Sequence, residues 1–141
     1  MKICMAGACG RMGRRILEMA AGMADVSIGG AFDMPSNAGM TLTVGMESGA
    51  PQGIVVGGEA AAEIAKSDVL IDFTLAEVCL ANVRTAAEQG KAAVVGTTGL
   101  SAEQTEALRA LSVKAPIVYA PNMSVGVNLL FKLTREVAGF L

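Results

Sequence analysis

The residue pattern with the clearest chemical meaning is Gly7-Ala8-Cys9-Gly10-Arg11-Met12-Gly13, which follows a short β-prone run at Lys2–Ala6 and opens a helical pattern. Glycines three apart at a strand–helix junction are typical of a turn that holds the pyrophosphate of a dinucleotide. Gly7 would permit the tight turn, Gly10 would let backbone N–H groups approach the phosphates, and Gly13 would let the helix pack on the strand. The helix N-terminus would add N–H donors and partial positive charge. The alternative is a glycine-rich turn that binds nothing.

Charged and reactive side chains lie in this turn and just after it. A cation at Arg11 opposes the helix macrodipole, and a bound phosphate would offset that cost. Arg14 and Arg15 could equally be solvated surface residues. Cys9 lies where a helix N-terminus can lower the pKa of a thiol, although the simpler interpretation is a small residue that fills the turn.

An acidic residue lies where dinucleotide-binding folds recognise ribose. Asp33 lies 20 residues after Gly13, at the end of a second β-prone run, Val26–Asp33. A carboxylate there can accept hydrogen bonds from the adenosine ribose hydroxyls and would repel the 2′-phosphate of NADP. The next residue, Met34, brings no compensating positive charge. We therefore predict a preference for NADH over NADPH, although Arg11 could serve a 2′-phosphate. For Asp33 the alternative is an ordinary turn residue at a strand end.

Composition excludes several other kinds of function. The 141 residues suit one domain, with 11 Lys and Arg, 13 Asp and Glu and no histidine. Without histidine there is no Ser-His-Asp or Cys-His catalysis and no His-ligated metal. The three cysteines are spread too widely for a disulfide framework or a metal site. The slightly acidic balance and the 4% aromatic content argue against broad nucleic-acid binding.

The hydrophobic content indicates a folded protein outside the membrane. A hydrophobic fraction of 52% and a mean hydropathy of +0.52 are far from the composition of disordered chains. No apolar run reaches the roughly 18 residues that a membrane helix needs. The Met-Lys start does not resemble a secretory signal, so we expect a cytoplasmic protein.

Strand-like and helix-like segments alternate along the chain. Strand-like runs lie at Lys2–Ala6, Val26–Asp33, Ile54–Val56, Val69–Phe73, Ala92–Gly96 and Pro116–Tyr119. Helix-like segments lie at Met12–Met23, Glu59–Lys66, Thr74 to about Gln89, Ser101 to about Lys114, and from Ser124 onward. Residues 34–53 carry glycines and prolines and are expected to be irregular. Thr74 with Glu77, and Ser101 with Gln104, form capping-box patterns. This alternation predicts an α/β fold, a doubly wound, Rossmann-like parallel sheet in a single domain.

Three further segments follow predicted strands at the carboxyl edge of the sheet, where ligands bind in such folds. They are Asp72-Phe73-Thr74, Gly96-Thr97-Thr98-Gly99, and the run from Ala120 to Asn128. Each also has an ordinary interpretation as turn or cap chemistry. The C-terminal segment is apolar at Leu129, Leu130, Phe131, Leu133, Val137, Phe140 and Leu141. Its helix either closes on this domain or leads into a further domain, and we favour the second.

Together these motifs resemble one family, the 4-hydroxy-tetrahydrodipicolinate reductases, also called dihydrodipicolinate reductases. The resemblance rests on Gly7–Gly13, Ile71–Thr74, Val95–Leu100 and Ala120–Asn128, in that order and at matching spacing across nearly the whole chain. It implies hydride transfer from NADH or NADPH to a cyclic dicarboxylate substrate in lysine and diaminopimelate biosynthesis. It also implies that the full enzyme is a homotetramer, while the composition and hydropathy above indicate no metal, nucleic-acid or membrane partner.

The resemblance also implies roles for individual residues. Gly7, Ala8, Cys9, Gly10, Arg11 and Met12 would hold the pyrophosphate, and Asp33 would bind ribose. Gly96, Thr97 and Thr98 would line the nicotinamide side. Ala120, Pro121, Asn122 and Met123 would contact the cofactor near a domain junction, with Phe73 beside them.

The family's catalytic His and Lys lie in a second domain that residues 1–141 do not contain. We therefore expect this chain to bind the cofactor without turnover. The alternatives are a stand-alone nucleotide-sensing module, which needs no catalytic group, and another oxidoreductase with a similar first half.

Overall fold

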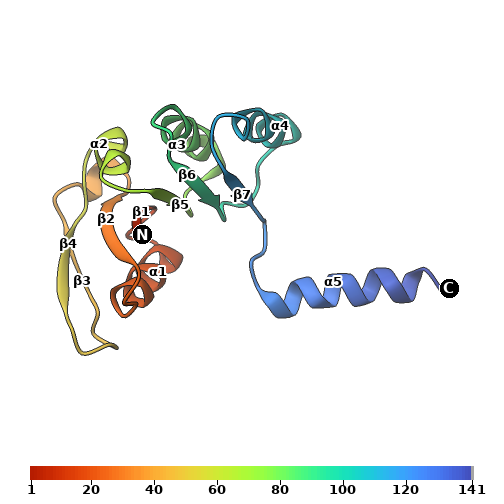
Figure 1. Ribbon diagram of the computed structural model, residues 1–141, viewed down its shortest axis with the longest axis horizontal. Helices are drawn as coiled ribbons and strands as arrows, with labels where there is room; N and C mark the ends of the chain where they lie inside the picture. Colours follow the sequence, from red (N-terminus) through yellow and green to blue (C-terminus); the bar gives the residue numbers. More distant parts are fainter. Residues whose placement is uncertain (141) are drawn as a thin grey trace.

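The computed structural model describes residues 1–140, which form a parallel sheet with helices on both faces (Figure 1). The strands of this sheet are β1 (Lys2–Ala6), β2 (Ser27–Phe32), β5 (Val69–Asp72), β6 (Ala92–Val95) and β7 (Ile117–Tyr119). They are arranged in the order β2-β1-β5-β6-β7, and every pair is parallel. The direction of winding therefore reverses between β1 and β5. In doubly wound folds, ligands bind at such a switch point. The strand order and the helices on both faces confirm the predicted doubly wound, Rossmann-like fold class.

The helices divide between the two faces of the sheet. They are α1 (Arg11–Ala21), α2 (Ala60–Ala65), α3 (Ala76–Glu88), α4 (Ala102–Leu111) and α5 (Val125–Ala138), with a short 3₁₀ turn at Pro35–Asn37. Figure 1 shows α2, α3 and α4 above the sheet and α1 on the opposite side. Each face has its own core: Leu70 and Val83 are buried in one, Met5 and Leu17 in the other. Burying a side chain such as Leu17 contributes about 2 kcal/mol.

The segment expected to be irregular, residues 34–53, contains a strand. β3 (Thr41–Val44) pairs antiparallel with β4 (Gln52–Val55) in a separate two-stranded sheet. Leu42 and Val44 alternate with exposed threonines and pack into the α1 core. The expectation was wrong because four alternating residues among glycines and prolines give a weak local signal, whereas burial of two side chains decides the conformation.

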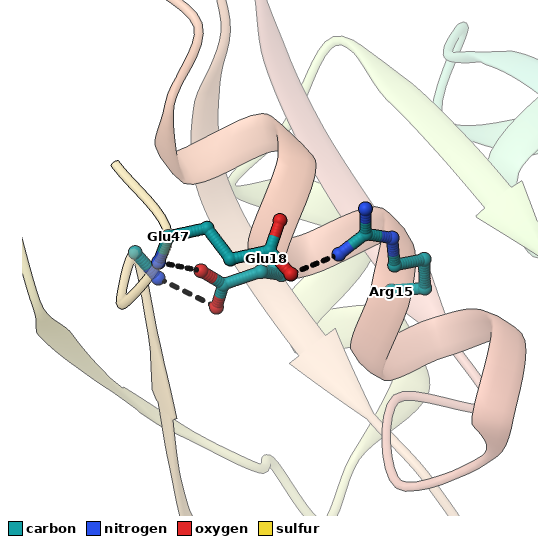
Figure 2. Close-up of polar contacts among 4 residues, drawn as sticks. Arg15, Glu18 and Glu47 are labelled. Atoms are coloured by element: carbon teal, nitrogen blue, oxygen red, sulfur yellow. Dashed lines mark hydrogen bonds and ion pairs between the residues drawn. The ribbon is translucent and has the colours of Figure 1, made fainter. Parts of the chain in front are cut away.

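The turn of this hairpin is held by α1 (Figure 2). The Glu18 carboxylate accepts hydrogen bonds from the backbone N–H of Gly45 (2.8 Å) and of Glu47 (2.7 Å). The Arg15 guanidinium forms an ion pair with the Glu47 side chain. Arg15, one of the two arginines that could have been solvated surface, thus joins α1 to the hairpin.

The two predicted capping boxes have different outcomes. Ser101 accepts a hydrogen bond from the Gln104 N–H, and the Gln104 side chain accepts one from the Ser101 N–H, as predicted. At α3 the N-cap is Leu75, which has no side-chain cap. Thr74 instead donates its hydroxyl to Asp72 at 2.7 Å. The Thr74 capping box was wrong because a buried carboxylate competes for that hydroxyl.

Helix α5 stands apart from the rest of the chain. Ser124 caps it as predicted, by accepting a hydrogen bond from the Val127 N–H. Figure 1 shows the helix projecting away from the sheet, and none of its residues is buried. It does not close on the parallel sheet, which was one of the two expected arrangements. Leu141, placed in this apolar segment by the sequence, lies outside the described residues.

No helix within residues 1–140 is long and apolar enough to cross a membrane.

Candidate functional site

The glycine turn joins β1 to α1 at the switch point of the sheet. Gly7 has φ +79°, and a Cβ added to it would lie 2.5 Å from the carbonyl oxygen of Phe73. Gly13 packs so closely on the Gly7 carbonyl oxygen that no Cβ fits. The turn geometry itself therefore requires these two glycines. Gly10 differs, because its φ is −69° and an added Cβ would meet only the Gly7 carbonyl oxygen, at 3.2 Å.

Most backbone N–H groups of the turn are already used by the protein. Those of Gly7 and Ala8 donate to the Phe32 carbonyl, and that of Gly10 donates to the Gly7 carbonyl. The Cys9 N–H donates to the Asp33 carboxylate at 2.8 Å. These four groups are therefore closed to a ligand unless the turn rearranges.

The next three N–H groups are free. Within residues 1–140, the N–H groups of Arg11, Met12 and Gly13 have no protein acceptor, and the first intrahelical bond runs from Arg14 to Gly10. Gly10 offers no side-chain cap, and the first turn of α1 carries no acidic residue. Positive partial charge is thus left uncompensated at this helix end, which suits an anion.

A cleft of about 770 Å³ opens beside this helix end, at the carboxyl ends of β5, β6 and β7. It is lined by Gly10, Arg11, Met12, Phe73, Thr74, Gly96, Thr97, Thr98, Pro121, Asn122, Met123 and Ser124. All three strand-end segments predicted from the sequence contribute to it. Arg11 is the one ionisable side chain in this lining, and it has no acidic partner among the described residues.

A second cleft, of about 590 Å³, lies on the other side of the glycine turn. It is lined by Gly7, Cys9, Gly10, Phe32, Asp33, Met34, Pro35, Asn37, Ala60, Phe73, Thr74, Leu75, Val78 and Asn82. Gly10, Phe73 and Thr74 line both clefts, so the two spaces meet at the turn. Its lining is largely apolar, which suits a flat base, and Asp33 supplies a carboxylate at its edge.

Asp33 is held in place by three hydrogen bonds. One carboxylate oxygen accepts from the Cys9 N–H, and the other accepts from the Met34 N–H (2.9 Å) and the Asn37 side chain (2.8 Å). A carboxylate has about four acceptor positions, so one remains for a ligand hydroxyl. The carboxylate joins the end of β2 to the glycine turn and still faces the second cleft.

Phe73 contributes to the lining of both clefts. Its ring lies directly on Gly96, where a Cβ would collide with it. The absence of a side chain at Gly96 therefore serves ring placement at the strand end, in addition to any contact with a ligand.

The side chain of Thr97 does not project into the cleft. It is buried, donates its hydroxyl to Asp72 at 2.7 Å and accepts the Thr74 N–H at 2.9 Å. Thr97 therefore presents backbone atoms to the cleft, whereas its neighbour Thr98 is exposed there.

Two residues predicted for the site lie outside both linings. The side chain of Ala8 is buried in the α1 core, and its N–H is used within the turn. Ala120 lies at the end of β7, where its N–H continues the ladder to Val95. The remaining predicted residues all line one cleft or both.

Sequence reasoning did not assign the apolar wall of the second cleft. That wall includes Ala60, Leu75 and Val78, which come from α2 and from the start of α3. Leu75 and Val78 are exposed apolar residues at the start of α3, and this exposure is a property of the fold that the local sequence does not reveal. Their meeting with Asp33 depends on the packing of α2 against β2 and of α3 against α2.

The surroundings of Cys9 do not lower the pKa of its thiol. Burial and the neighbouring Asp33 carboxylate raise the pKa of this thiol, and the Arg14 guanidinium opposes them. Arg14 also donates to the Cys9 carbonyl at 3.1 Å, so it holds the turn and is not merely solvated. The possibility of a thiol activated by the helix N-terminus was wrong. No group of three His, Cys, Asp or Glu within residues 1–140 could hold a metal ion.

Comparison with known proteins assigns this chain to a family. Residues 1–123 match the family model described as dihydrodipicolinate reductase, N-terminus. Relatives include the 4-hydroxy-tetrahydrodipicolinate reductases of Aromatoleum aromaticum, 43% identical, and Desulfotalea psychrophila, 41% identical. These alignments cover 100% and 99% of this chain but 51% and 52% of the relatives. The chain therefore spans about half the length of the curated relatives it matches.

Solved structures of other proteins share the fold. The amine dehydrogenase of Mycobacterium smegmatis matches with a TM-score of 0.60 and 23% identity, over 79% of this chain and 36% of that one. An aspartate semialdehyde dehydrogenase with NADP from Candida albicans matches with a TM-score of 0.58 and 21% identity, over 69% of this chain and 29% of that one. At these identities the likeness concerns the fold alone.

Proposed function

Because this chain belongs to the family of dihydrodipicolinate reductase N-terminal domains, we propose that it binds NADH or NADPH as the nucleotide-binding half of a 4-hydroxy-tetrahydrodipicolinate reductase. The observation that carries this proposal is the uncapped start of α1, which faces two adjoining clefts. Clefts of about 770 and 590 Å³ are within the size range of small-molecule and cofactor sites.

The pyrophosphate would lie at the start of α1. The free N–H groups of Arg11, Met12 and Gly13 supply donors, and the Arg11 side chain supplies a full positive charge. The bare backbone of Gly10 leaves room for phosphate oxygens. In this arrangement Gly7 shapes the turn. Ala8 and Cys9 stabilise the turn through their N–H bonds to Phe32 and Asp33 and do not contact the phosphate.

The adenosine would occupy the second cleft. The remaining acceptor position of Asp33 suits a ribose hydroxyl, and Leu75 and Val78 suit one face of the base. A 2′-phosphate would bring like charge against Asp33, and Met34 offers no cation. We therefore propose that NADH binds more tightly than NADPH.

The nicotinamide would lie in the first cleft, between Phe73 and the segment from Pro121 to Met123. When bound, the reduced nicotinamide supplies the hydride. The task of this chain is to orient the ring and to exclude water from one side of it. Gly96 and Thr98 would border the ring, and Ala120 would support the Pro121 segment from the end of β7.

The reduction of a cyclic dicarboxylate would need groups beyond this cleft. The chain has no histidine, and Arg11 is the one ionisable residue in the lining of the first cleft. We propose that acid–base groups, a His and a Lys, and the substrate site belong to the half of the relatives that this chain does not match. The homotetramer is likewise a proposal for the full enzyme. This chain alone would bind cofactor without turnover.

A titration of the 141-residue chain with NADH and NADPH, followed by nicotinamide fluorescence, tests the proposal. We expect saturable binding with the lower Kd for NADH. Far-UV circular dichroism must first show that the chain is folded. A folded chain that bound neither nucleotide would contradict the proposal, and tighter NADPH binding would contradict only the role given to Asp33.

A further inference from the structure

A buried carboxylate lies beneath the junction of the two clefts. Asp72, the last residue of β5, is 0% exposed, and no basic side chain pairs with it among the described residues. Burying a carboxylate is costly unless hydrogen bonds satisfy it. An apolar residue could fill this buried position without that cost, so the Asp72 carboxylate must have a structural or functional role that an apolar side chain could not have.

The partners of Asp72 come from three different elements. One carboxylate oxygen accepts from the Thr97 hydroxyl (2.7 Å), the Thr74 hydroxyl (2.7 Å) and the Thr74 N–H (3.1 Å). The other accepts from the Asn82 side chain at 2.9 Å. Thr97 in turn accepts the Thr74 N–H at 2.9 Å. The loop after β5, the loop after β6 and helix α3 are therefore joined at one side chain.

These bonds fix the cleft surfaces relative to each other. Phe73 lies between Asp72 and Thr74, so its backbone is held on both sides, and its ring is seated on Gly96. Thr74 and Thr97 line the first cleft, and Asn82 lines the second. None of the bonds of Asp72 reaches the free N–H groups at the start of α1.

We propose that Asp72 is a positioning residue for the nicotinamide end of the cofactor. It does not contact the ligand. It holds the Phe73–Thr74 and Gly96–Thr97 loops at the spacing that the nicotinamide requires, whereas none of its bonds reaches the N–H groups proposed for the pyrophosphate or the Asp33 carboxylate proposed for the ribose. This inference rests on the proposed function, since it presupposes a dinucleotide across the two clefts.

The test compares NADH with ADP-ribose, which carries the adenosine and the pyrophosphate but no nicotinamide. In Asp72→Asn, one acceptor oxygen becomes a donor, so at least one buried donor loses its partner. We expect NADH to bind about tenfold or more weakly, a change of roughly 1.4 kcal/mol, with ADP-ribose changed less than about threefold. Asp68→Asn is the matched control, because Asp68 accepts the Lys2 N–H at the opposite end of the same strand. It should bind both ligands as the unchanged chain does.

A second pair of variants keeps the test valid if Asp72→Asn fails to fold. Thr97→Val removes the hydroxyl with little change in shape, and Thr97→Ser restores it. We expect Thr97→Val to lose NADH affinity selectively and Thr97→Ser to recover most of it. In the weakened variants, the fluorescence emission of bound NADH should shift toward that of the free nucleotide, which a loss of stability alone would not cause.

The outcomes separate this inference from the proposed function. Equal losses for NADH and ADP-ribose, or an unchanged NADH affinity in folded Thr97→Val, would overturn the positioning role while leaving the proposed function intact. If the unchanged folded chain bound neither ligand, the proposed function would fail, and the inference would fail with it.

Discussion

Gly13 packs directly on the carbonyl oxygen of Gly7, with no space between them for a Cβ atom. This contact brings the first turn of α1 against the end of β1 and fixes the direction in which the free N–H groups point. Gly10, three residues before Gly13 and just as near the proposed phosphate position, has no comparable contact. The three glycines of the motif therefore have different roles: Gly7 and Gly13 are needed for the fold, and Gly10 leaves the phosphate position accessible.

We expect Gly10→Val to remain folded but to lose NADH binding, because its side chain would occupy the phosphate position. The cost to the free energy of unfolding should be about 1 kcal/mol, the usual effect of an unfavourable N-cap residue. Gly13→Val, the matched control, should lose the fold. Circular dichroism and NADH titration would check both variants. Full NADH affinity in Gly10→Val would show that the pyrophosphate does not bind at this turn.

Met34→Arg should increase affinity for NADPH. Met34 is 63% exposed and lines the second cleft next to Asp33, so a cation there would attract a 2′-phosphate. We expect the NADPH Kd to fall by about tenfold at low salt, with less effect at high salt, and the NADH Kd to change little. Met46→Arg is the control, since Met46 is similarly exposed and lies in neither lining. An equal gain in that variant would indicate a general charge effect.

Alkylation of the native chain should be slow, and Cys9 should react first. Cys4 and Cys79 are buried, whereas Cys9 is partly exposed in the second cleft. The pKa of Cys9 is raised, so its thiolate fraction at pH 8 is lower than that of a free cysteine, and the rate should rise toward more alkaline pH. Iodoacetamide labelling followed by mass spectrometry would measure this, with Cys9→Ser as the control. Bound NADH should protect Cys9, and labelling unaffected by NADH would argue against adenosine in that cleft.

Stability should fall at alkaline pH because of the two buried thiols. Burial raises the pKa of both Cys4 and Cys79 to about 12 from 9.0. Between these values the unfolded chain loses thiol protons that the folded chain retains. The stabilisation is therefore complete below pH 9 and decreases as pH rises toward 12, by at most about 1.4 kcal/mol per pH unit for each thiol.

Urea denaturation at several pH values from 8 to 10.5 would measure this slope. Cys79→Ala should be less stable at pH 8 but should lose stability less steeply as pH increases. A slope identical to that of the unchanged chain would mean that Cys79 titrates normally in the fold.

Helix α5 should promote self-association of the 141-residue chain. Leu129, Leu133 and Val137 lie four residues apart on one side of the helix and are 48–58% exposed. An apolar stripe of this kind favours association in water. We expect Leu133→Asp with Val137→Asp to reduce the average mass measured by light scattering, without altering NADH affinity. Lys132→Gln on the same helix should leave the mass unchanged. Equal masses for all three chains would exclude α5 as the contact.

Local patterns in the sequence were sufficient to predict the strands of the parallel sheet and most helix positions. Apolar runs predicted all five strands of the parallel sheet to within about a residue at each end, as at Val69–Asp72. Helix α4 begins at its predicted capping box, although it ends at Leu111 rather than near Lys114. These features depend on burial periodicity and turn chemistry within a few residues, which a single sequence contains.

Contacts between distant segments were not predictable in the same way. The hairpin of β3 and β4 depends on the burial of Leu42 and Val44 in the α1 core, and Glu18, on a different element, holds its turn. Thr74 matches a capping pattern but serves Asp72 instead, and Thr97 reaches the same carboxylate from 25 residues away. A local motif has no information about which partner competes for its side chain.

The sequence by itself determined the fold class, the glycine turn and the segments that gather at the carboxyl edge of the sheet, because glycine spacing and apolar periodicity are properties of the local chain. Only the tertiary structure decided which N–H groups of the turn remain free, which residues form the wall of the second cleft, and that the Thr97 hydroxyl faces inward. Each of these depends on how many hydrogen-bond partners and how much space the folded neighbours leave, and those are fixed only when β1, β2, β5 and β6 have assembled.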